Sequence, residues 1–505
     1  MHTLLIPLLA VTVSAGHIKA LYNSLDPSSI SQHLALYELY PDSPEGQRAL
    51  REAWTLLAGN TPLTGDELPP FKAFREAVEG IITLVNKPAE QETIDLSDSS
   101  LLIVEKLAGH LPNRKLKGHF AEDEQEIFKL PPEEIDLARG LLLSQIPPSE
   151  QRLRKIRSYE AMLDLMALQL LSRIRLDSPP EAKIRAINTF IFEEMGYRFP
   201  PHSLYAKDID LYTFLPSVLD SRRGVCLGVS ILYHTLAQRL GLPLETVTPP
   251  GHIYVRYHQG DRVINIETTA RGIHIDSEEY LGIDTRSLEE RNIKEVIGMA
   301  HFNQASVYWQ NGEFQRALDA YHKALPYLPN DMLVKELMAY NYLFTGQLDK
   351  AEPLLQAVKD HLPEYAVTKQ NVVEDYLNGA VDADGIKPLF MHVDETRASI
   401  LKKKEALEGV LAKYPRYRSG LLALATTWLQ LHRMSEALQV LEKLHALDPT
   451  DPTVAYYLTE IYAERLDYNN AWKHLRLAET LTKSRNHEPK ALADLRKTLS
   501  THYPE

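Results

Sequence analysis

The chain has 505 residues, of which 44% are hydrophobic and 24% charged, and its mean hydropathy is −0.26. This composition is typical of a soluble globular protein, and the length predicts about three domains. The net charge of −13, without a sustained run of Lys and Arg, argues against nucleic acid or an anionic membrane surface as a partner. The single cysteine, Cys226, excludes intrachain disulfides, cysteine-based zinc modules and iron–sulfur clusters.

The N-terminus has two readings. An apolar run, Leu4–Val13, is followed by the small residues Ser14 and Ala15, as at a signal-peptide cleavage site, but only His2 precedes the run where a basic segment is usual. Residues 1–15 are therefore either a signal peptide or a first buried helix, and the protein either exported or cytoplasmic. The run is too short to cross a bilayer and no other stretch is long enough, so we expect no membrane span.

Helical periodicity dominates the first 149 residues. Apolar residues recur at three- and four-residue spacing in five segments: Ile30–Tyr40, Gln47–Leu57, Phe71–Val85, Leu101–Leu107 and Ile135–Leu143. Paired prolines, as at Pro131-Pro132, separate such segments because proline ends helices. No chemical motif occurs here, so residues 1–149 are predicted to form a helical region of unknown role.

In residues 150–297 the hydrophobic pattern changes from helical spacing to short β-rich stretches. Helices are predicted over Glu150–Leu176, Pro180–Met195 and Leu227–Leu240. Short β-rich stretches follow, at Glu245–Val247, His252–Tyr257 and Val263–Glu267. Helices followed by a run of strands favour an α+β domain with an antiparallel sheet, which we place at 150–297.

Beyond residue 298 the chain repeats with a period of 34 residues. Units 298–331, 332–365, 418–451 and 452–485 carry alanine at the same position, namely Ala317, Ala351, Ala437 and Ala471. A degenerate unit fits 384–417, after an insertion at about Glu364–Ala383, and 486–505 remains as a tail. This pattern resembles the tetratricopeptide repeat and predicts a C-terminal α-solenoid.

The resemblance also implies a binding surface. In tetratricopeptide arrays the first helix of each unit lines the concave face, where this chain offers Phe302, Trp309 and Tyr340. Such an aromatic, weakly acidic lining favours an apolar or basic extended segment, either from a partner protein or from Tyr365–Asp384 folding back. The other reading is that the array only supports the middle domain. The sequence does not define the oligomeric state.

Three residues of the middle domain could carry chemistry. Cys226 lies where a glycine-containing loop enters an apolar helix, and a helix N-terminus favours a thiolate and offers amides to an oxyanion. His252 follows a Pro-Pro-Gly turn, and Glu267 ends the next strand of an apparent hairpin, so the two could be cross-strand neighbours. Asn265 shares the Glu267 face and is the alternative third member.

Together these residues form the pattern of a cysteine acyl-transfer triad. The histidine would promote the thiolate and protonate the leaving amine, and the carboxylate would orient the histidine. The alternative is that Cys226 is a small buried hydrophobic residue. No His-Glu-x-x-His motif or cysteine pair supports a metal site, and no nucleotide-binding glycine motif is present, so we expect no cofactor.

The order of cysteine, histidine and acid on helix, strand and strand resembles the transglutaminase-like superfamily of papain-like fold. A bacterial family related to an invasion-gene regulator, which joins such a domain to tetratricopeptide repeats, is similar in several segments: Phe190–Tyr197, Leu215–Val225, Leu232–Leu242 and Pro250–His252. The resemblance implies an α+β fold and a triad of Cys226, His252 and an acid.

This sequence departs from the family in two places. Glu267-Thr268-Thr269 stands where an Asp-Pro-Thr-like turn is usual, and Ile253 separates His252 from the aromatic Tyr254. Many members also lack the cysteine that is retained here. Two functions follow: a cysteine-dependent hydrolase or transferase acting on amide or isopeptide bonds, or a non-catalytic scaffold that binds protein partners through its repeats.

Overall fold

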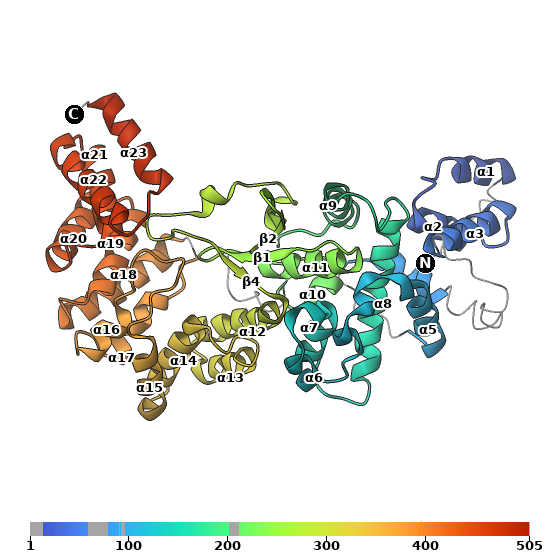
Figure 1. Ribbon diagram of the computed structural model, residues 1–505, viewed down its shortest axis with the longest axis horizontal. Coiled ribbons are helices and arrows are strands. Elements are labelled where there is room, and N and C mark those ends of the chain that lie inside the picture. The colour runs from blue at the N-terminus through green and yellow to red at the C-terminus, as the bar shows by residue number, and fades with distance from the viewer. Residues whose placement is uncertain are drawn as a thin grey trace, which may run out of the picture. The chain divides into compact units, whose positions relative to one another are not determined.

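The computed structural model describes residues 14–58, 79–89, 91, 96–200, 212–394 and 396–503 (Figure 1). The chain divides into two compact units. The first extends to Tyr197 and also includes Leu215–Arg222 and Leu232–Pro243. The second comprises Arg198–Phe214, Arg223–Ile231 and all residues from Leu244. The apolar run Leu4–Val13, the candidate signal peptide, lies outside the described residues.

The first unit is helical, as predicted. Its helices are α1 (Ala15–Asn23), α2 (Ile30–Leu39), α3 (Pro44–Ala58), α5 (Asp98–Leu107), α6 (Glu124–Lys129), α7 (Leu137–Gln145), α8 (Arg152–Leu171) and α9 (Pro180–Asn188), with a further helical stretch over 79–85. Of the predicted segment Phe71–Val85, only this last part lies in the described residues. Short 3-10 turns connect α5 to α6, between residues 108 and 120.

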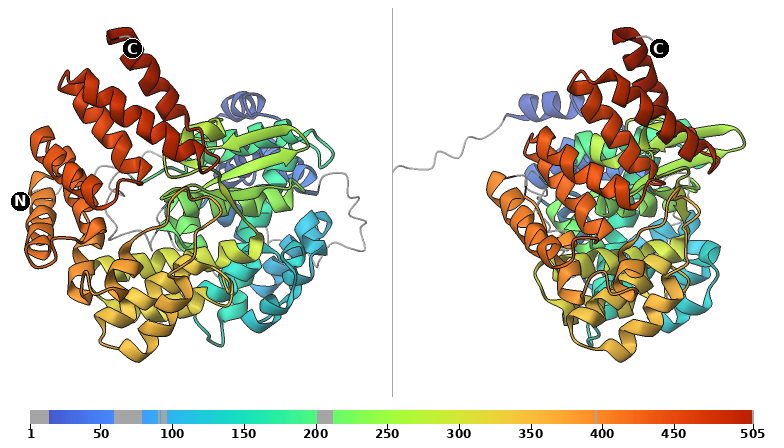
Figure 2. Two further views of the ribbon diagram at one scale, coloured as in Figure 1. Left: turned by 60° about the vertical axis from the view of Figure 1, so that its left-hand side comes forward. Right: turned by 90° about the vertical axis from the view of Figure 1, so that its left-hand side faces the viewer.

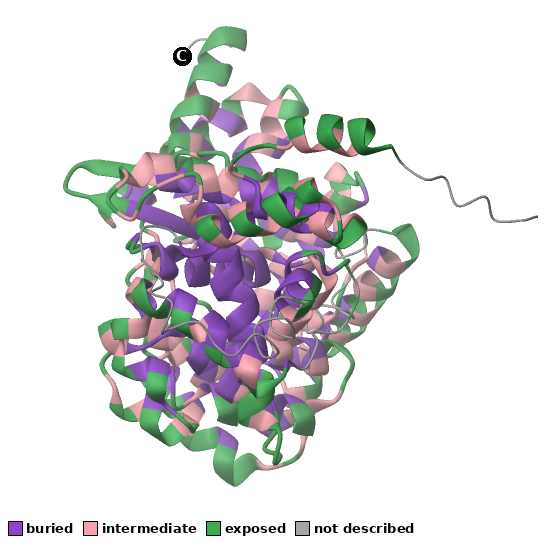
Figure 3. Ribbon diagram, turned by 90° about the vertical axis from the view of Figure 1, so that its right-hand side faces the viewer, coloured by how far each residue is buried: buried purple, intermediate pink, exposed green. Residues whose placement is uncertain are grey.

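Helix α8 forms the centre of this unit. All of its residues from Ser158 to Leu170 are buried, on every side of the helix (Figure 3). A helix that is apolar and buried all round must have neighbours on all faces, and α3, α5 and α7 pack against it. A π-helical turn, η6 (Thr189–Glu194), extends α9, and α10 (Leu215–Ser221) and α11 (Cys226–Arg239) follow.

A four-stranded antiparallel sheet lies at the start of the second unit. Its strands are β1 (Glu245–Thr248), β2 (Tyr254–Gln259), β3 (Arg262–Ile266) and β4 (Glu289–Arg291), in the order β3-β2-β1-β4. Strands β2 and β3 form the predicted hairpin, with Gly260 at a positive φ of 59° in the turn. The predicted α+β fold is confirmed. The polar three-residue strand β4 has no hydrophobic pattern and was not predicted.

The C-terminal array consists of stacked antiparallel helix pairs (Figures 1 and 2). They are α12 (Ile293–Gln310) with α13 (Phe314–Ala324), α14 (Met332–Phe344) with α15 (Leu348–Val358), α19 (Arg418–Gln430) with α20 (Met434–Leu447), and α21 (Pro452–Glu464) with α22 (Tyr468–Lys483). The four alanines that define the repeat are fully buried in this stack. Their small size lets the paired helices approach closely, and the predicted solenoid is confirmed.

The degenerate unit departs from the repeat. Between the two halves of the array lie α16 (Val372–Leu377), α17 (Ala383–Ile386), the 3-10 turn η11 (Lys387–Phe390) and the long helix α18 (Arg397–Lys413). Two short turns, α17 and η11, thus replace the first helix of unit 384–417. In the predicted tail, α23 (Lys490–His502) packs against α21 and α22. No helix in the described ranges has the length and apolar character that a membrane crossing requires.

Candidate active site

Cys226 is the first residue of α11, and the loop before it is shaped by backbone contacts. A Cβ on Gly224 would lie 2.7 Å from the Val229 Cγ2 atom, so this position requires glycine for the chain to turn into the helix. The Val225 amide donates to the Tyr212 carbonyl, which fixes the loop. The Cys226 side chain is partly exposed. The first-turn amides of a helix have no intrahelical acceptor and are open to an anion at this point.

His252 and Glu267 meet at one end of the β2–β3 hairpin. Pairing of Val255 with Ile266 sets the register, and His252 lies in the turn before β2 while Glu267 follows β3 directly. The ring nitrogen Nε2 of His252 lies 2.6 Å from Oε2 of Glu267. The predicted cross-strand pair is therefore formed, although both residues lie just outside the strands.

Glu267 is held by four hydrogen bonds. Besides His252, the Tyr280 hydroxyl donates to Oε2 at 2.7 Å, and the Thr269 amide and hydroxyl donate to Oε1 at 3.1 and 2.6 Å. Its side chain is only 4% exposed. Burial opposes ionisation, but the bonds from His252, Thr269 and Tyr280 hold the pKa of Glu267 down at about 2. The carboxylate is thus charged and fixed in orientation at neutral pH.

The charge of His252 depends on the residues on both sides of its ring. Burial opposes the imidazolium, but hydrogen bonds and charge interactions with Cys226 and Glu267 outweigh it and raise the pKa of His252 to about 9. Because Glu267 occupies Nε2, the other ring nitrogen, Nδ1, is left for the thiol. The structure therefore joins His252 to Glu267 by a hydrogen bond and places Cys226 close enough to His252 to raise the pKa of the imidazole.

Tyr280 is part of this site and was not predicted. Its ring stacks on the His252 ring at 5.9 Å between centroids and on the Tyr254 ring at 4.8 Å. Tyr280 comes from the turn η10 (Ser277–Tyr280), and its spacing to Glu267 has no period that would reveal it. The contact of Thr269 with Glu267 could have been predicted, because an acidic side chain commonly accepts a hydrogen bond from a residue two positions later in the sequence.

Asn265, the alternative third member, has other partners. Its carbonyl oxygen accepts from the Arg256 Nε at 2.9 Å, and its amide nitrogen donates to the Ile275 carbonyl at 2.7 Å. The side chain is buried. Asn265 thus fixes the loop that follows β3, and Glu267 rather than Asn265 contacts His252.

The predicted partner-binding aromatics differ in burial. Phe302 is partly buried, Trp309 is 7% exposed and Tyr340 is fully buried. Phe390 of η11 packs on Trp309 at 4.6 Å and on Tyr340 at 5.7 Å between ring centroids. Tyr340 was expected on the concave surface and lies beneath it instead, because Phe390, in the irregular start of unit 384–417, packs over it. Phe302 and Trp309 line a cavity.

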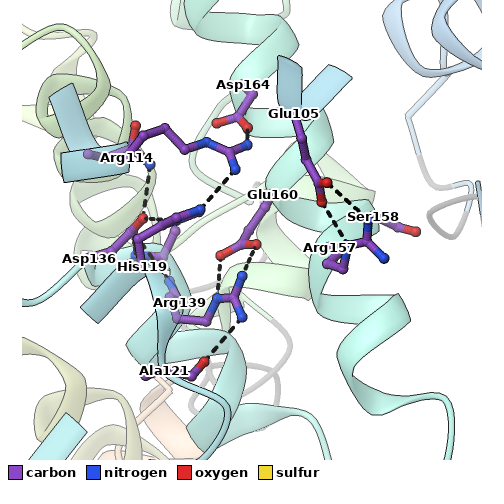
Figure 4. Close-up of polar contacts among 12 residues, drawn as sticks. Glu105, Arg114, His119, Ala121, Asp136, Arg139, Arg157, Ser158, Glu160 and Asp164 are labelled. Atoms are coloured by element: carbon purple, nitrogen blue, oxygen red, sulfur yellow. Dashed lines mark hydrogen bonds and ion pairs between the residues drawn. The ribbon is translucent and has the colours of Figure 1, made fainter. Parts of the chain in front are cut away.

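One group of side chains in the described ranges could supply ligands to a metal. His119, Asp136 and Glu160, all buried in the first unit, have candidate ligand atoms within 4.8 Å of one another. Every one of these atoms already has a partner (Figure 4). Arg139 donates two bonds to Glu160, of 2.7 and 2.6 Å, and His119 Nδ1 lies 3.0 Å from Asp136.

Arginines balance the charge of this cluster. Arg114 pairs with Asp164 and donates to His119 Nε2, and Arg239 donates to Asp164 at 2.8 Å. The guanidiniums of Arg114, Arg139 and Arg239 thus match the carboxylates of Asp136, Glu160 and Asp164. A metal would have to displace paired arginines, so we interpret the cluster as a structural ion network.

A family profile described as the transglutaminase-like superfamily matches residues 157–292. A second profile, for the tetratricopeptide repeat, matches residues 300–335. The chain carries a transglutaminase-like domain followed by tetratricopeptide repeats. The first profile covers Cys226, His252 and Glu267 together with the whole sheet.

Several curated proteins are similar to parts of the chain. A "UPF0162 protein" of Xylella fastidiosa (strain Temecula1) is 25% identical over 226 residues, or 42% of this chain and 78% of that protein. The "TPR repeat-containing protein PA4667" of Pseudomonas aeruginosa is 26% identical over 31% of this chain and 30% of that protein. Human "F-box only protein 21" is 31% identical over 99 residues, 20% of this chain and 14% of that protein.

Among solved structures, the Thermus thermophilus tetratricopeptide protein TTC0263 is 17% identical with a TM-score of 0.21, covering 40% of this chain and 97% of that one. The TPR2AB domain of yeast Sti1, solved as an HSP90 complex, is 16% identical with a TM-score of 0.21, covering 40% and 85%.

Proposed function

We propose that the transglutaminase-like domain is a cysteine-dependent acyl-transfer enzyme acting on amide or isopeptide bonds, as a hydrolase or a transferase. The observation that carries this proposal is the chain of contacts from Cys226 to His252 to Glu267. A histidine that bonds a helix-start thiol on one side and a buried carboxylate on the other is the arrangement that acyl transfer by cysteine requires.

The first step forms an acyl-enzyme. The Cys226 thiolate attacks the carbonyl carbon of the amide, and the developing oxyanion accepts hydrogen bonds from first-turn amides of α11. The C–N bond then breaks, and the His252 imidazolium gives its proton to the leaving amine. Glu267 keeps the ring oriented through Nε2. The products are a thioester on Cys226 and a free amine.

The second step releases the acyl group. Neutral His252 takes a proton from water or from a second amine, which attacks the thioester carbonyl. The carbon–sulfur bond breaks, and the sulfur leaves as thiolate beside the re-formed imidazolium. Water yields a carboxylic acid and an amine yields a new amide. The same residues serve both outcomes, so the acceptor decides between hydrolysis and transfer.

We propose further that the repeat array binds a protein or peptide partner through the surface around Phe302 and Trp309. The support is a cavity of about 290 Å³ lined by both side chains. Cavities with apolar walls and a few polar groups are usual binding sites. The array would hold the polypeptide that contains, or accepts, the transferred acyl group.

An activated ester tests the chemistry without knowledge of the substrate. With p-nitrophenyl acetate, wild-type protein should release a stoichiometric burst of p-nitrophenol while acetate becomes attached to Cys226. Cys226→Ser and His252→Ala should abolish the burst and leave the thermal midpoint within a few degrees. If wild type shows no burst beyond that of Cys226→Ser, and both substitutions only lower stability, the non-catalytic scaffold is the correct reading.

A further inference from the structure

Two adjoining cavities flank the side chain of Glu336 on α14. The larger, of about 290 Å³, contains the aromatic wall of Phe302, Trp309 and Phe390. The smaller, of about 180 Å³, lies against the insertion around Tyr365 and Lys369. Both are lined by Leu333, Glu336 and Gln370, so they form one groove with Glu336 at its middle. We call it the Glu336 groove.

Glu336 is a half-buried carboxylate that has no Lys or Arg partner in the described residues and only His361 as a nearby basic group. Its one hydrogen bond comes from the Tyr340 hydroxyl, at 2.6 Å, and no Lys or Arg in the described residues forms an ion pair with it. Burial raises the pKa of Glu336, and the Tyr340 bond and the charge of His361 offset this only in part. Carboxylates that are largely removed from solvent are normally paired with a cation, and Glu336 has no Lys or Arg in that role among the described residues.

The other charged groups of the groove do not fill that gap. Lys369, which lines the smaller cavity, points to Asp360, with its Nζ 3.8 Å from Oδ1. A second carboxylate, Asp284, is part of the same wall and has no ion pair with a described Lys or Arg. The groove thus holds two carboxylates, Glu336 and Asp284, without a Lys or Arg partner in the described residues, although His361 lies in the same wall. These carboxylates and the net charge of −13 both attract a cation.

The groove is open to solvent and reaches toward the candidate active site. Leu333, which lines both cavities, is 44% exposed. At the other end Pro250 lines the smaller cavity, two residues before His252 in the same turn. Both the groove and the triad belong to the second unit. A polypeptide in the groove would thus extend toward the turn that carries the catalytic histidine.

We propose that the Glu336 groove binds an extended segment of a partner polypeptide, placing a Lys or Arg side chain against Glu336 and an apolar side chain beside Phe302 and Trp309. The insertion supplies Gln370 and the irregular start of unit 384–417 supplies Phe390, so the site exists because the regular repeat is interrupted. That this segment belongs to the substrate of Cys226 rests on the proposed function. Binding of the segment rests on the proposed partner-binding role of the array and is independent of any catalysis by Cys226.

Fluorescence anisotropy with two labelled peptides tests the proposal. One peptide alternates Leu and Lys, and the other has Gln in place of every Lys. Both are titrated with full-length Cys226→Ser protein, so that no acyl transfer interferes. The Lys peptide should bind at least about tenfold more tightly than the Gln peptide. Glu336→Gln should remove this difference by weakening only the Lys peptide.

Two further variants separate a specific effect of Glu336 from a general effect of net charge. Glu405→Gln removes the same charge from an exposed position on α18 and should leave both affinities unchanged. Leu333→Arg, at an exposed position that tolerates substitution, places a tethered cation beside Glu336 and should weaken the Lys peptide more than the Gln peptide. Equal affinities of the two peptides, or equal losses in Glu336→Gln and Glu405→Gln, would overturn the proposal. Selective binding without any esterase burst would instead retain the groove and reject the catalytic function.

Discussion

Replacing Glu267 by Gln tests the electrostatics of the site with little change of shape. The carboxylate accepts bonds from His252, Thr269 and Tyr280, and the amide keeps the volume but offers one acceptor atom instead of two. It also has no charge to stabilise the imidazolium. Both effects act on the protonation of His252, which the proposed mechanism uses in each step.

The size of the effect follows from the pKa of His252. A rise from 6.5 to about 9 corresponds to roughly 3 kcal/mol of stabilisation of the imidazolium, at about 1.4 kcal/mol for each tenfold change. Cys226 and Glu267 share this, so losing Glu267 should lower the pKa of His252 by about one unit or more. Turnover should fall by on the order of 10²- to 10⁴-fold, since an amide also favours the wrong tautomer.

The pH profile of the esterase burst is the assay. The basic limb, where His252 loses its proton, should lie near 9 in wild type and move to lower pH in Glu267→Gln. The raised pKa of His252 also contributes to the free energy of unfolding. This contribution is fully present below about pH 6.5 and is lost as the pH rises through about 9. The lowered pKa of Glu267 makes a second contribution to the free energy of unfolding, which is fully present above about pH 4.5 and is lost as the pH falls toward 2. An unmoved basic limb and wild-type turnover would refute the reasoning.

Three other substitutions have defined outcomes. Tyr280→Phe removes the hydroxyl that donates to Glu267 but keeps the ring stacked on His252, so stability should fall by about 1 kcal/mol and the burst rate by up to about tenfold, as stopped-flow absorbance would show. Glu160→Gln leaves Arg139 without its buried counterion and should lower the free energy of unfolding by about 3–5 kcal/mol in urea titrations, whereas a loss under about 1 kcal/mol would contradict the ion-network interpretation. Trp309→Ala should weaken partner capture by about 2 kcal/mol, measured by calorimetry, without slowing Cys226 alkylation; retained affinity would reject Trp309 as an anchor.

Local patterns were sufficient to predict most of the architecture. Helix α8 is a long, largely apolar segment, and short β-rich runs on either side of the Gly260 turn mark the β2–β3 hairpin. The 34-residue repeat is visible because a buried alanine recurs at the same position of each regular unit. The triad could be predicted because the hairpin itself brings His252 and Glu267 to one end, and because Cys226 is the only thiol.

Features that depend on long-range packing could not be predicted in this way. Asp164 and Arg239 are 75 residues apart, and nothing in either segment indicates that they pair. Tyr280 reaches Glu267 from an irregular turn, without a sequence period. The burial of Tyr340 depends on Phe390, a residue of the degenerate unit 384–417, where the repeat pattern fails. In each case the partner is determined by how distant segments pack in three dimensions rather than by their spacing in the sequence.

The central claim is that His252 activates Cys226, and alkylation of the thiol tests it most directly. Because the chain has one cysteine, labelling with iodoacetamide, followed by intact-mass spectrometry, reports on that residue alone. At pH 6, wild type should be labelled stoichiometrically, and His252→Ala should react at least about tenfold more slowly. A wild-type rate no faster than that of the urea-unfolded chain, and unchanged in His252→Ala, would contradict the account.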